Sequence, residues 1–141
     1  MDGQRLVLPG SIFFETAKPT LKPESDVALN HVLKYLKAKK HVTKIRIEGH
    51  TDTDGKDEDN MVLSKLRAMA VAKWLSVKGI DCKRLVPVGF GETKLKKSPE
   101  ETPEDKEANR RVDFVNAELN GKAIGGLPVD GGGESAGNAC E

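Results

Sequence analysis

Polar side chains interrupt the core-facing stripe of one predicted helix. Helix-forming residues dominate from about Asn60 to Lys78. At 100° per residue, six of them share a stripe roughly a third of the circumference wide. These are Asn60, Ser64, Arg67, Val71, Trp74 and Leu75. The first half of the stripe carries an amide, a hydroxyl and a guanidinium, so we expect the chemistry of this helix near its amino end.

The guanidinium of Arg67 needs a partner. An arginine on a largely buried stripe is costly unless its donors are paired, which calls for a carboxylate nearby. The preceding loop offers Asp52, Asp54, Asp57, Glu58 and Asp59. The pattern alone leaves two interpretations open: a permanent ion pair with one of these acids, or a functional site.

The same acidic loop, Asp52 to Asp59, suggests a cation site, because hard cations favour clustered carboxylates. The spacing of a calcium loop is absent. Counted from Asp52, Gly55 stands at the fourth position rather than the sixth, Lys56 occupies a ligand place, and Leu63 replaces the bidentate glutamate. A solvated loop before the helix is favoured, no metal ligand is predicted, and a cation-binding interaction domain is kept as the alternative function.

Catalysis is not predicted. A hydrolase needs a nucleophile held by a base, and the only local candidates are His50, Asp52 and Ser64. Neither a Gly-x-Ser-x-Gly elbow nor a His-Glu-x-x-His metal motif is present. We therefore expect a non-enzymatic protein that needs no cofactor.

Charge and hydropathy exclude two classes of partner. The 23 Lys and Arg residues are offset by 22 Asp and Glu, which leaves a net charge of +1. A global attraction to nucleic acid or anionic lipid is not expected. No apolar run approaches the roughly 18 residues of a membrane-spanning helix, so direct membrane insertion by this chain is not expected.

The amino terminus lacks the features of a signal peptide and is interpreted as the start of a mature fragment. The oligomeric state stays open.

Strands and helices are predicted to alternate along the chain. Strand pieces are expected at Arg5 to Leu8 and Ser11 to Phe14, broken by Pro9-Gly10. The strand Val42 to Gly49 alternates cleanly, with Arg46 and Glu48 opposite its apolar face, so it should be half-buried. The other expected elements are helices from Pro23 to Lys40 and Asn60 to Lys78, strands from Arg84 to Phe90 and Arg111 to Ala117, and a charged loop from Lys94 to Ala108 with a helical turn just before Asn109.

This order, β-α-β-α-β-β, predicts one sheet with helices packed against it, in a single domain over residues 4 to 119. Residues 120 to 141 hold seven of the 14 glycines and few large apolar side chains, so a disordered tail is expected there. Cys82 and Cys140 show no metal-type spacing. They are interpreted as free thiols or an incidental bridge, and their pairing stays open.

A series of residues at fixed spacing closely resembles the OmpA-like peptidoglycan-binding family, which includes the peptidoglycan-associated lipoproteins and the wall-binding domain of flagellar stators. The resemblance spans about Ile12 to Ala117, and its most specific part is the spacing Asn-x-x-Leu-Ser-x-x-Arg-Ala after Thr-Asp. The matching residues are Gly49-His50-Thr51-Asp52, Asn60, Leu63-Ser64, Arg67-Ala68, Val71, Leu75, Gly79-Ile80, Arg84, Gly89-Phe90-Gly91 and Asn109-Arg110-Arg111-Val112.

The resemblance implies an α+β fold of two layers, a mixed sheet with two main helices against it. It also implies a pocket for the stem peptide of peptidoglycan. In the family, the aspartate matching Asp52 takes the ligand's ammonium and the arginine matching Arg67 takes its carboxylate. Further site residues implied in or beside the pocket are Thr51, Asn60, Leu63 and Arg110, with Thr16 and Ala17 from the loop after the first strand. Leu95 and the pair Asp105-Lys106 depart from the family pattern, which concerns the conformation of the long loop.

Diaminopimelate fits this pair of charges, because its side chain ends in both an ammonium and a carboxylate. The expected function is therefore non-covalent binding of peptidoglycan through diaminopimelate, which would tether a membrane protein to the wall. The expected location is the periplasm, as the soluble domain of an outer-membrane or other cell-envelope protein. Whether the parent is a barrel, a lipoprotein or a motor stator stays open.

Overall fold

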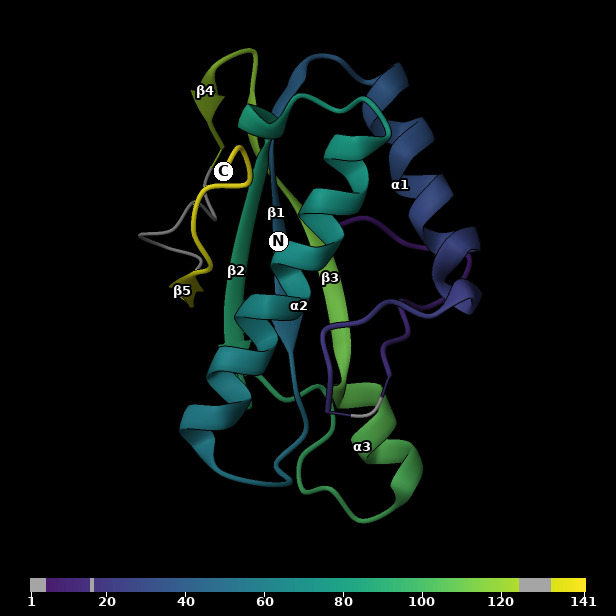
Figure 1. Ribbon diagram of the computed structural model, residues 1–141, viewed down its shortest axis with the longest axis vertical. Helices are drawn as coiled ribbons and strands as arrows, with labels where there is room; N and C mark the ends of the chain where they lie inside the picture. Colours follow the sequence, from purple (N-terminus) through teal and green to yellow (C-terminus); the bar gives the residue numbers. More distant parts are fainter. Residues whose placement is uncertain (1–4, 16, 125–132) are drawn as a thin grey trace.

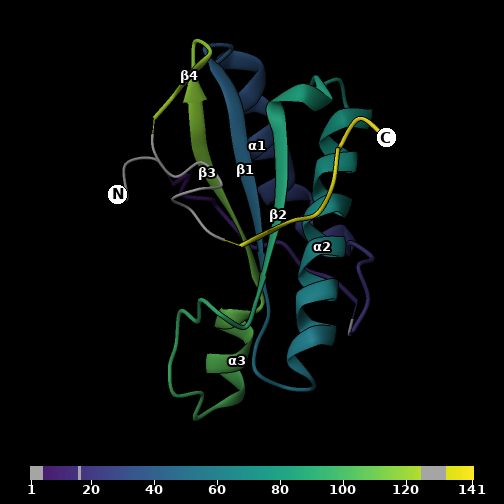
Figure 2. The same cartoon turned by 90° about the vertical axis from the view of Figure 1, so that its left-hand side faces the viewer.

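A computed structural model describes residues 5–15, 17–124 and 133–141. Helices α1 and α2 lie on one side of a five-stranded sheet, and the short α3 lies at one end of the molecule (Figures 1 and 2). The elements are η2 (Pro23–Ser25), α1 (Asp26–Ala38), β1 (Val42–His50), α2 (Asp57–Val77), η3 (Cys82–Arg84), β2 (Leu85–Gly91), α3 (Pro103–Asn109), β3 (Arg111–Leu119), β4 (Lys122–Ala123) and β5 (Glu134–Ser135).

The strand order is β4-β3-β1-β2-β5. β1 pairs with β2 in parallel and with β3 antiparallel, so the sheet is mixed and the α+β class is confirmed. The carboxyl end of β1 thereby lies beside the start of β3, at the same end of the molecule as α3 (Figure 1). Among the described residues, none of the helices is long and apolar enough to cross a membrane.

Two glycines let the first half of α2 lie close to the sheet. A Cβ atom on Gly49 would overlap the main-chain carbonyl of Ser64, and one on Gly89 would overlap Lys65. Only glycine leaves room for such an approach. The predicted core stripe is confirmed for five of its six residues, and Trp74 is half-buried. This packing holds the polar residues of α2 at the end of β1.

The predicted amino-terminal strand pieces are wrong. Arg5 and Phe14 form only isolated bridges, to Val115 and Leu21 respectively. Leu6 donates one main-chain hydrogen bond to Phe114 (2.9 Å) before the chain bends at Pro9 and Gly10. Each piece makes too few ladder hydrogen bonds to form a regular strand.

The polar face of β1 is more buried than its alternation predicts. Arg46 is 0% exposed and Glu48 is 7% exposed. Arg46 Nε donates to Glu48 at 2.8 Å, and the guanidinium lies 5.7 Å from the ring centroid of Phe90. Pairing of the charges allows burial that the two side chains could not have separately.

The carboxyl end of the chain also differs from its prediction. Asn120 and Gly121 both have positive φ and close a hairpin between β3 and β4, as an Asn-Gly pair favours. β5 pairs with β2, and a disulfide joins Cys140 to Cys82. Residues 120–124 and 133–141 therefore belong to the folded unit, and residues 125–132 lie outside the described part of the chain.

Candidate ligand-binding site

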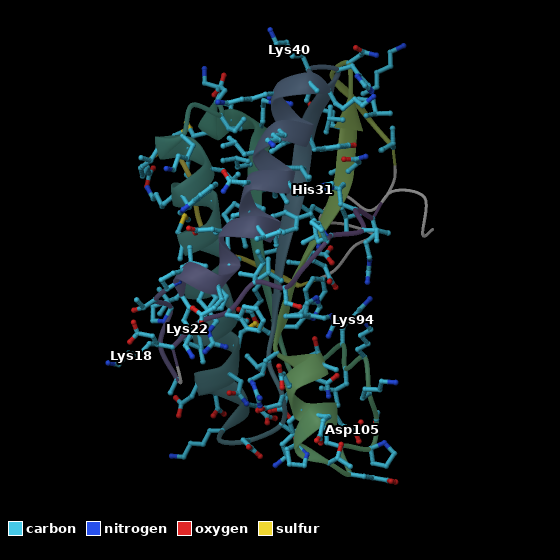
Figure 3. The ribbon with its side chains drawn as sticks, turned by 90° about the vertical axis from the view of Figure 1, so that its right-hand side faces the viewer. Lys18, Lys22, His31, Lys40, Lys94 and Asp105 are labelled. Carbon is cyan, nitrogen blue, oxygen red and sulfur yellow. A yellow bond between two sulfur atoms is a disulfide. The ribbon has the colours of Figure 1, made fainter. Side chains whose placement is uncertain are left out.

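A cavity of about 890 Å³ opens where β1 ends, between α2, α3 and the amino-terminal segment. All the site residues predicted from the sequence that the structure describes line it, namely Ala17, Thr51, Asp52, Asn60, Leu63, Arg67 and Arg110. Thr16 lies outside the described residues. In Figure 3, Lys18 and Lys22 lie on the α2 side of this end of the molecule and Asp105 marks α3 on the other side.

Arg67 is held by main-chain carbonyls rather than by an acid. Its Nε donates to the Lys18 carbonyl at 3.1 Å and its Nη2 to the Glu15 carbonyl at 3.3 Å. The guanidinium stacks over the ring of Phe14, 4.9 Å from its centroid. The interpretation of Arg67 as half of a permanent ion pair with an acid of the loop is therefore wrong, although Asp52 lies near enough to act on its charge. Among the described residues, Nη1 of Arg67 has no hydrogen-bond partner.

The pKa of Arg67 depends on its burial and on two neighbouring charges. The side chain is only 7% exposed, and this burial lowers the pKa of Arg67. The nearby Arg110 cation lowers that pKa further, while Asp52 raises it. A guanidinium stays protonated at neutral pH even so, which makes this buried cation a strong point of attraction for an anion.

Asp52 is buried, and both of its carboxylate oxygens accept hydrogen bonds. Its Oδ1 accepts the Asp54 main-chain N–H at 2.9 Å, and its Oδ2 accepts Arg110 Nη1 at 2.5 Å. Thr51 orders the same turn, because its N–H donates to the Gly91 carbonyl at 2.8 Å and its hydroxyl to the Asp52 carbonyl at 2.9 Å. The carboxylate is therefore fixed in place before any ligand arrives.

Asn60 fixes the loop that carries Asp52. Its side-chain nitrogen donates to the Asp54 carbonyl at 2.9 Å and to Glu92 Oε1 at 3.1 Å. The next polar residue of the stripe, Ser64, accepts the Gly91 N–H at 2.9 Å. The polar half of the α2 stripe thus joins α2 to the loop after β1 and to the end of β2 with the loop that follows it.

Two residues that were not predicted as site residues organise the far wall of the cavity. Glu100 accepts the Thr53 N–H (3.2 Å) and hydroxyl (2.5 Å), and it also accepts the Asn109 side-chain amide at 2.6 Å. Lys106 pairs with Asp54 at 2.8 Å. These contacts link α3 and its preceding loop to the Asp52 loop. Glu100 lies in a segment without a repeating pattern, so no signal in the sequence could have identified it.

The acidic loop does not assemble a cation site among the described residues. Asp52 pairs with Arg110 and Asp54 with Lys106, while the remaining three acids, at positions 57 to 59, lie in the first turn of α2. Negative side chains there stabilise the positive end of the helix dipole. The alternative function of cation binding through this loop gains no support.

A different group of acids, Glu48 and Asp113 with His50, brings three potential metal ligands within 4.8 Å of one another. Three arginines already pair with its carboxylates. Arg46 contacts Glu48 at 2.8 Å, and Asp113 Oδ2 accepts Arg111 at 3.0 Å and Arg5 at 3.2 Å. These cations repel a metal ion, so we interpret the group as an ion-pair network beneath the site.

His50 makes the stability of this network depend on pH. It is 3% exposed and stacks on Phe90 with 4.9 Å between ring centroids. Burial is the main cause that lowers the pKa of His50 from 6.5. The unfolded chain therefore takes up this proton at a higher pH than the folded one. The stabilising contribution is complete above pH 6.5 and is lost as the pH falls through the lower pKa of the folded state.

We expect thermal unfolding to show the pH dependence of stability that His50 confers. The midpoint of the native protein should fall between about pH 7.5 and pH 5.5, in the range where an ordinary histidine titrates. His50→Gln should reduce that fall, because a glutamine cannot be protonated. His31→Gln removes an exposed histidine of α1 (Figure 3) and serves as the control. Equal pH dependence in the native protein and His50→Gln would contradict the assignment.

Known proteins are similar to this chain over much of its length. The model of the OmpA family matches residues 13–110. The chain is 37% identical over 110 residues to outer membrane protein A of Bordetella avium, covering 78% of this chain and 56% of that protein. It is 36% identical over 107 residues to the peptidoglycan-associated lipoprotein of Pseudomonas putida, covering 74% of this chain and 61% of the relative.

A solved structure shares the fold. The peptidoglycan-associated lipoprotein from Burkholderia pseudomallei matches with a TM-score of 0.67 and 28% identity, over 74% of this chain and 87% of that one. The chain spans between 13% and 61% of the length of the first four curated relatives that it matches.

Proposed function

The chain belongs to the OmpA family, and on that premise we propose that it binds peptidoglycan and anchors a cell-envelope protein to the wall without a covalent bond. Relatives named as peptidoglycan-associated lipoproteins support this proposal. The observation that carries it is the cavity in which a fixed acid, Asp52, and a buried arginine, Arg67, both face the same space.

The ligand of this proposal is the diaminopimelate residue of the stem peptide. Asp52 would take its ammonium, and Nη1 of Arg67 would take its terminal carboxylate. Each charge-assisted hydrogen bond contributes roughly 1.5 to 3 kcal/mol. The two fixed groups favour the ligand because neither has to be ordered on binding.

The remaining residues of the proposed site shape the cavity. Thr51 and Asn60 hold the Asp52 loop through the hydrogen bonds described above, and Leu63 adds an apolar side chain to the wall. Ala17 lies in the turn whose Glu15 and Lys18 carbonyls accept from Arg67. Thr16, which lies outside the described residues, is proposed as a site residue from the resemblance alone.

We place this domain in an oxidising compartment of the cell envelope. The Cys82–Cys140 disulfide supports this location, because such bonds persist in the periplasm and outside the cell and are rare in the cytosol. The names of the relatives, an outer membrane protein and a lipoprotein, agree with it.

Co-sedimentation with purified diaminopimelate-type sacculi tests the function. The native protein should pellet with the sacculi, and Asp52→Asn should weaken binding by about ten-fold to a hundred-fold, because an amide keeps the shape but not the charge. Asp26→Asn, which changes an exposed acid of α1, should pellet like the native protein. The proposal fails if the native protein stays in the supernatant or if Asp52→Asn pellets equally well.

A further inference from the structure

The ligand-free site already contains a cation where the proposed ligand places its ammonium. Arg110 Nη1 lies 2.5 Å from Asp52 Oδ2, and Oδ1 accepts the Asp54 N–H. Asp52 carries a single negative charge, which Arg110 already pairs. An incoming ammonium therefore competes with Arg110 for that charge.

The two arginines of the cavity are held very differently. Arg67 is 7% exposed and donates to two carbonyls, whereas the Arg110 side chain is 42% exposed and its contact with Asp52 is the one hydrogen bond it makes among the described residues. An exposed side chain on the rim changes rotamer at little cost. Arg110 can leave Asp52, while Arg67 cannot leave its loop without unpairing both carbonyls.

The charges of the cavity are unbalanced. Arg67 and Arg110 both lie near Asp52, and the two guanidiniums are close enough to repel each other. Asp52 lies near both guanidiniums, so a ligand that brings only an ammonium adds a third cation beside this carboxylate. A ligand that brings a carboxylate as well provides the displaced Arg110 with a partner.

We propose that Arg110 is a latch on Asp52 that is released only when the ligand offers a carboxylate in exchange. The ammonium then replaces Arg110 on Asp52, and Arg110 turns to the ligand carboxylate beside Arg67. The latch makes Arg110 a specificity-determining residue: it penalises ligands with an ammonium alone and favours those with both charges. This inference rests on the proposed function.

The test compares two muropeptides, one with diaminopimelate and one with lysine, on the native protein and on Arg110→Gln by calorimetric titration. In Arg110→Gln the lysine-type muropeptide should bind at least about threefold more tightly than it does to the native protein, because no guanidinium competes with its ammonium for Asp52. The diaminopimelate muropeptide should bind about ten-fold more weakly, because its carboxylate loses one guanidinium. The ratio of the two affinities should therefore fall steeply.

Lys65→Gln is the control. It also removes one positive charge, but Lys65 pairs with Glu134 and does not line the cavity, so the affinity ratio should stay as in the native protein. Equal weakening of both muropeptides in folded Arg110→Gln, with native binding intact, would overturn the latch alone. Failure of the native protein to bind either muropeptide would overturn the proposed function together with the latch.

Discussion

Replacing Arg67 by alanine is expected to weaken the binding of a diaminopimelate muropeptide by about a hundred-fold or more. The ligand carboxylate would enter a buried cavity without the guanidinium that the proposal assigns to it, and an unpaired buried charge is strongly unfavourable. Calorimetric titration of the variant beside the native protein measures the loss. Undiminished affinity in a folded Arg67→Ala variant would contradict the site.

The same variant should also be less stable, by about 1 to 3 kcal/mol. Arg67 donates to the Glu15 and Lys18 carbonyls and stacks on Phe14, so the turn from 15 to 18 loses its attachment to α2. Arg67→Lys keeps the charge but cannot reproduce the planar arrangement of donors. We expect it to restore part of the stability and less of the affinity.

Arg84 provides the matched control for this pair of effects. It is an arginine that likewise donates to main-chain carbonyls, those of Leu36, Lys39 and Val42, and it does not line the cavity. Arg84→Ala should lower the thermal midpoint as Arg67→Ala does, yet leave the affinity of the folded protein unchanged. A loss of affinity in Arg84→Ala would show that destabilisation alone explains the result for Arg67.

The sequence predicted the residues of the proposed site mainly through the spacing that resembles the OmpA-like family, because the helical stripe alone left a purely structural role for Arg67 open. The helical stripe brings Arg67 to the amino half of α2, and the alternation of β1 brings Asp52 just beyond its end. The partners of these residues were not predictable. Arg67 is held by carbonyl groups, which every residue possesses, so nothing in the sequence distinguishes the carbonyls of Glu15 and Lys18 from others.

The burial of Arg46 and Glu48 shows a second limit of prediction from the sequence. Period-two alternation separates the two faces of β1 correctly, but whether a charged face is solvated depends on what covers it and on which charges it meets. Here Arg46 is paired with Glu48 and lies over Phe90. Glu48 is a neighbour on β1, whereas Phe90 comes from β2, which is distant in the sequence.

The sequence signals for structure at the carboxyl end and at α3 differ in strength. Composition favoured disorder after residue 119, yet Asn120-Gly121 is a hairpin signal, and a bond between Cys82 and Cys140 requires a proximity that sequence cannot reveal. For α3 the sequence predicted a helical turn just before Asn109. Its start is marked by Thr102 and Asp105, which form a capping box with Pro103 at the first helical position.

The most direct test of the two-charge mechanism keeps the protein unchanged and removes one charge from the ligand. Titration calorimetry at physiological salt would compare a diaminopimelate muropeptide with its lysine counterpart, which lacks the side-chain carboxylate. The account predicts saturable binding of the first and binding of the second weaker by about ten-fold to a hundred-fold or more, since Arg67 and Arg110 lose their anion. Equal affinities would contradict it.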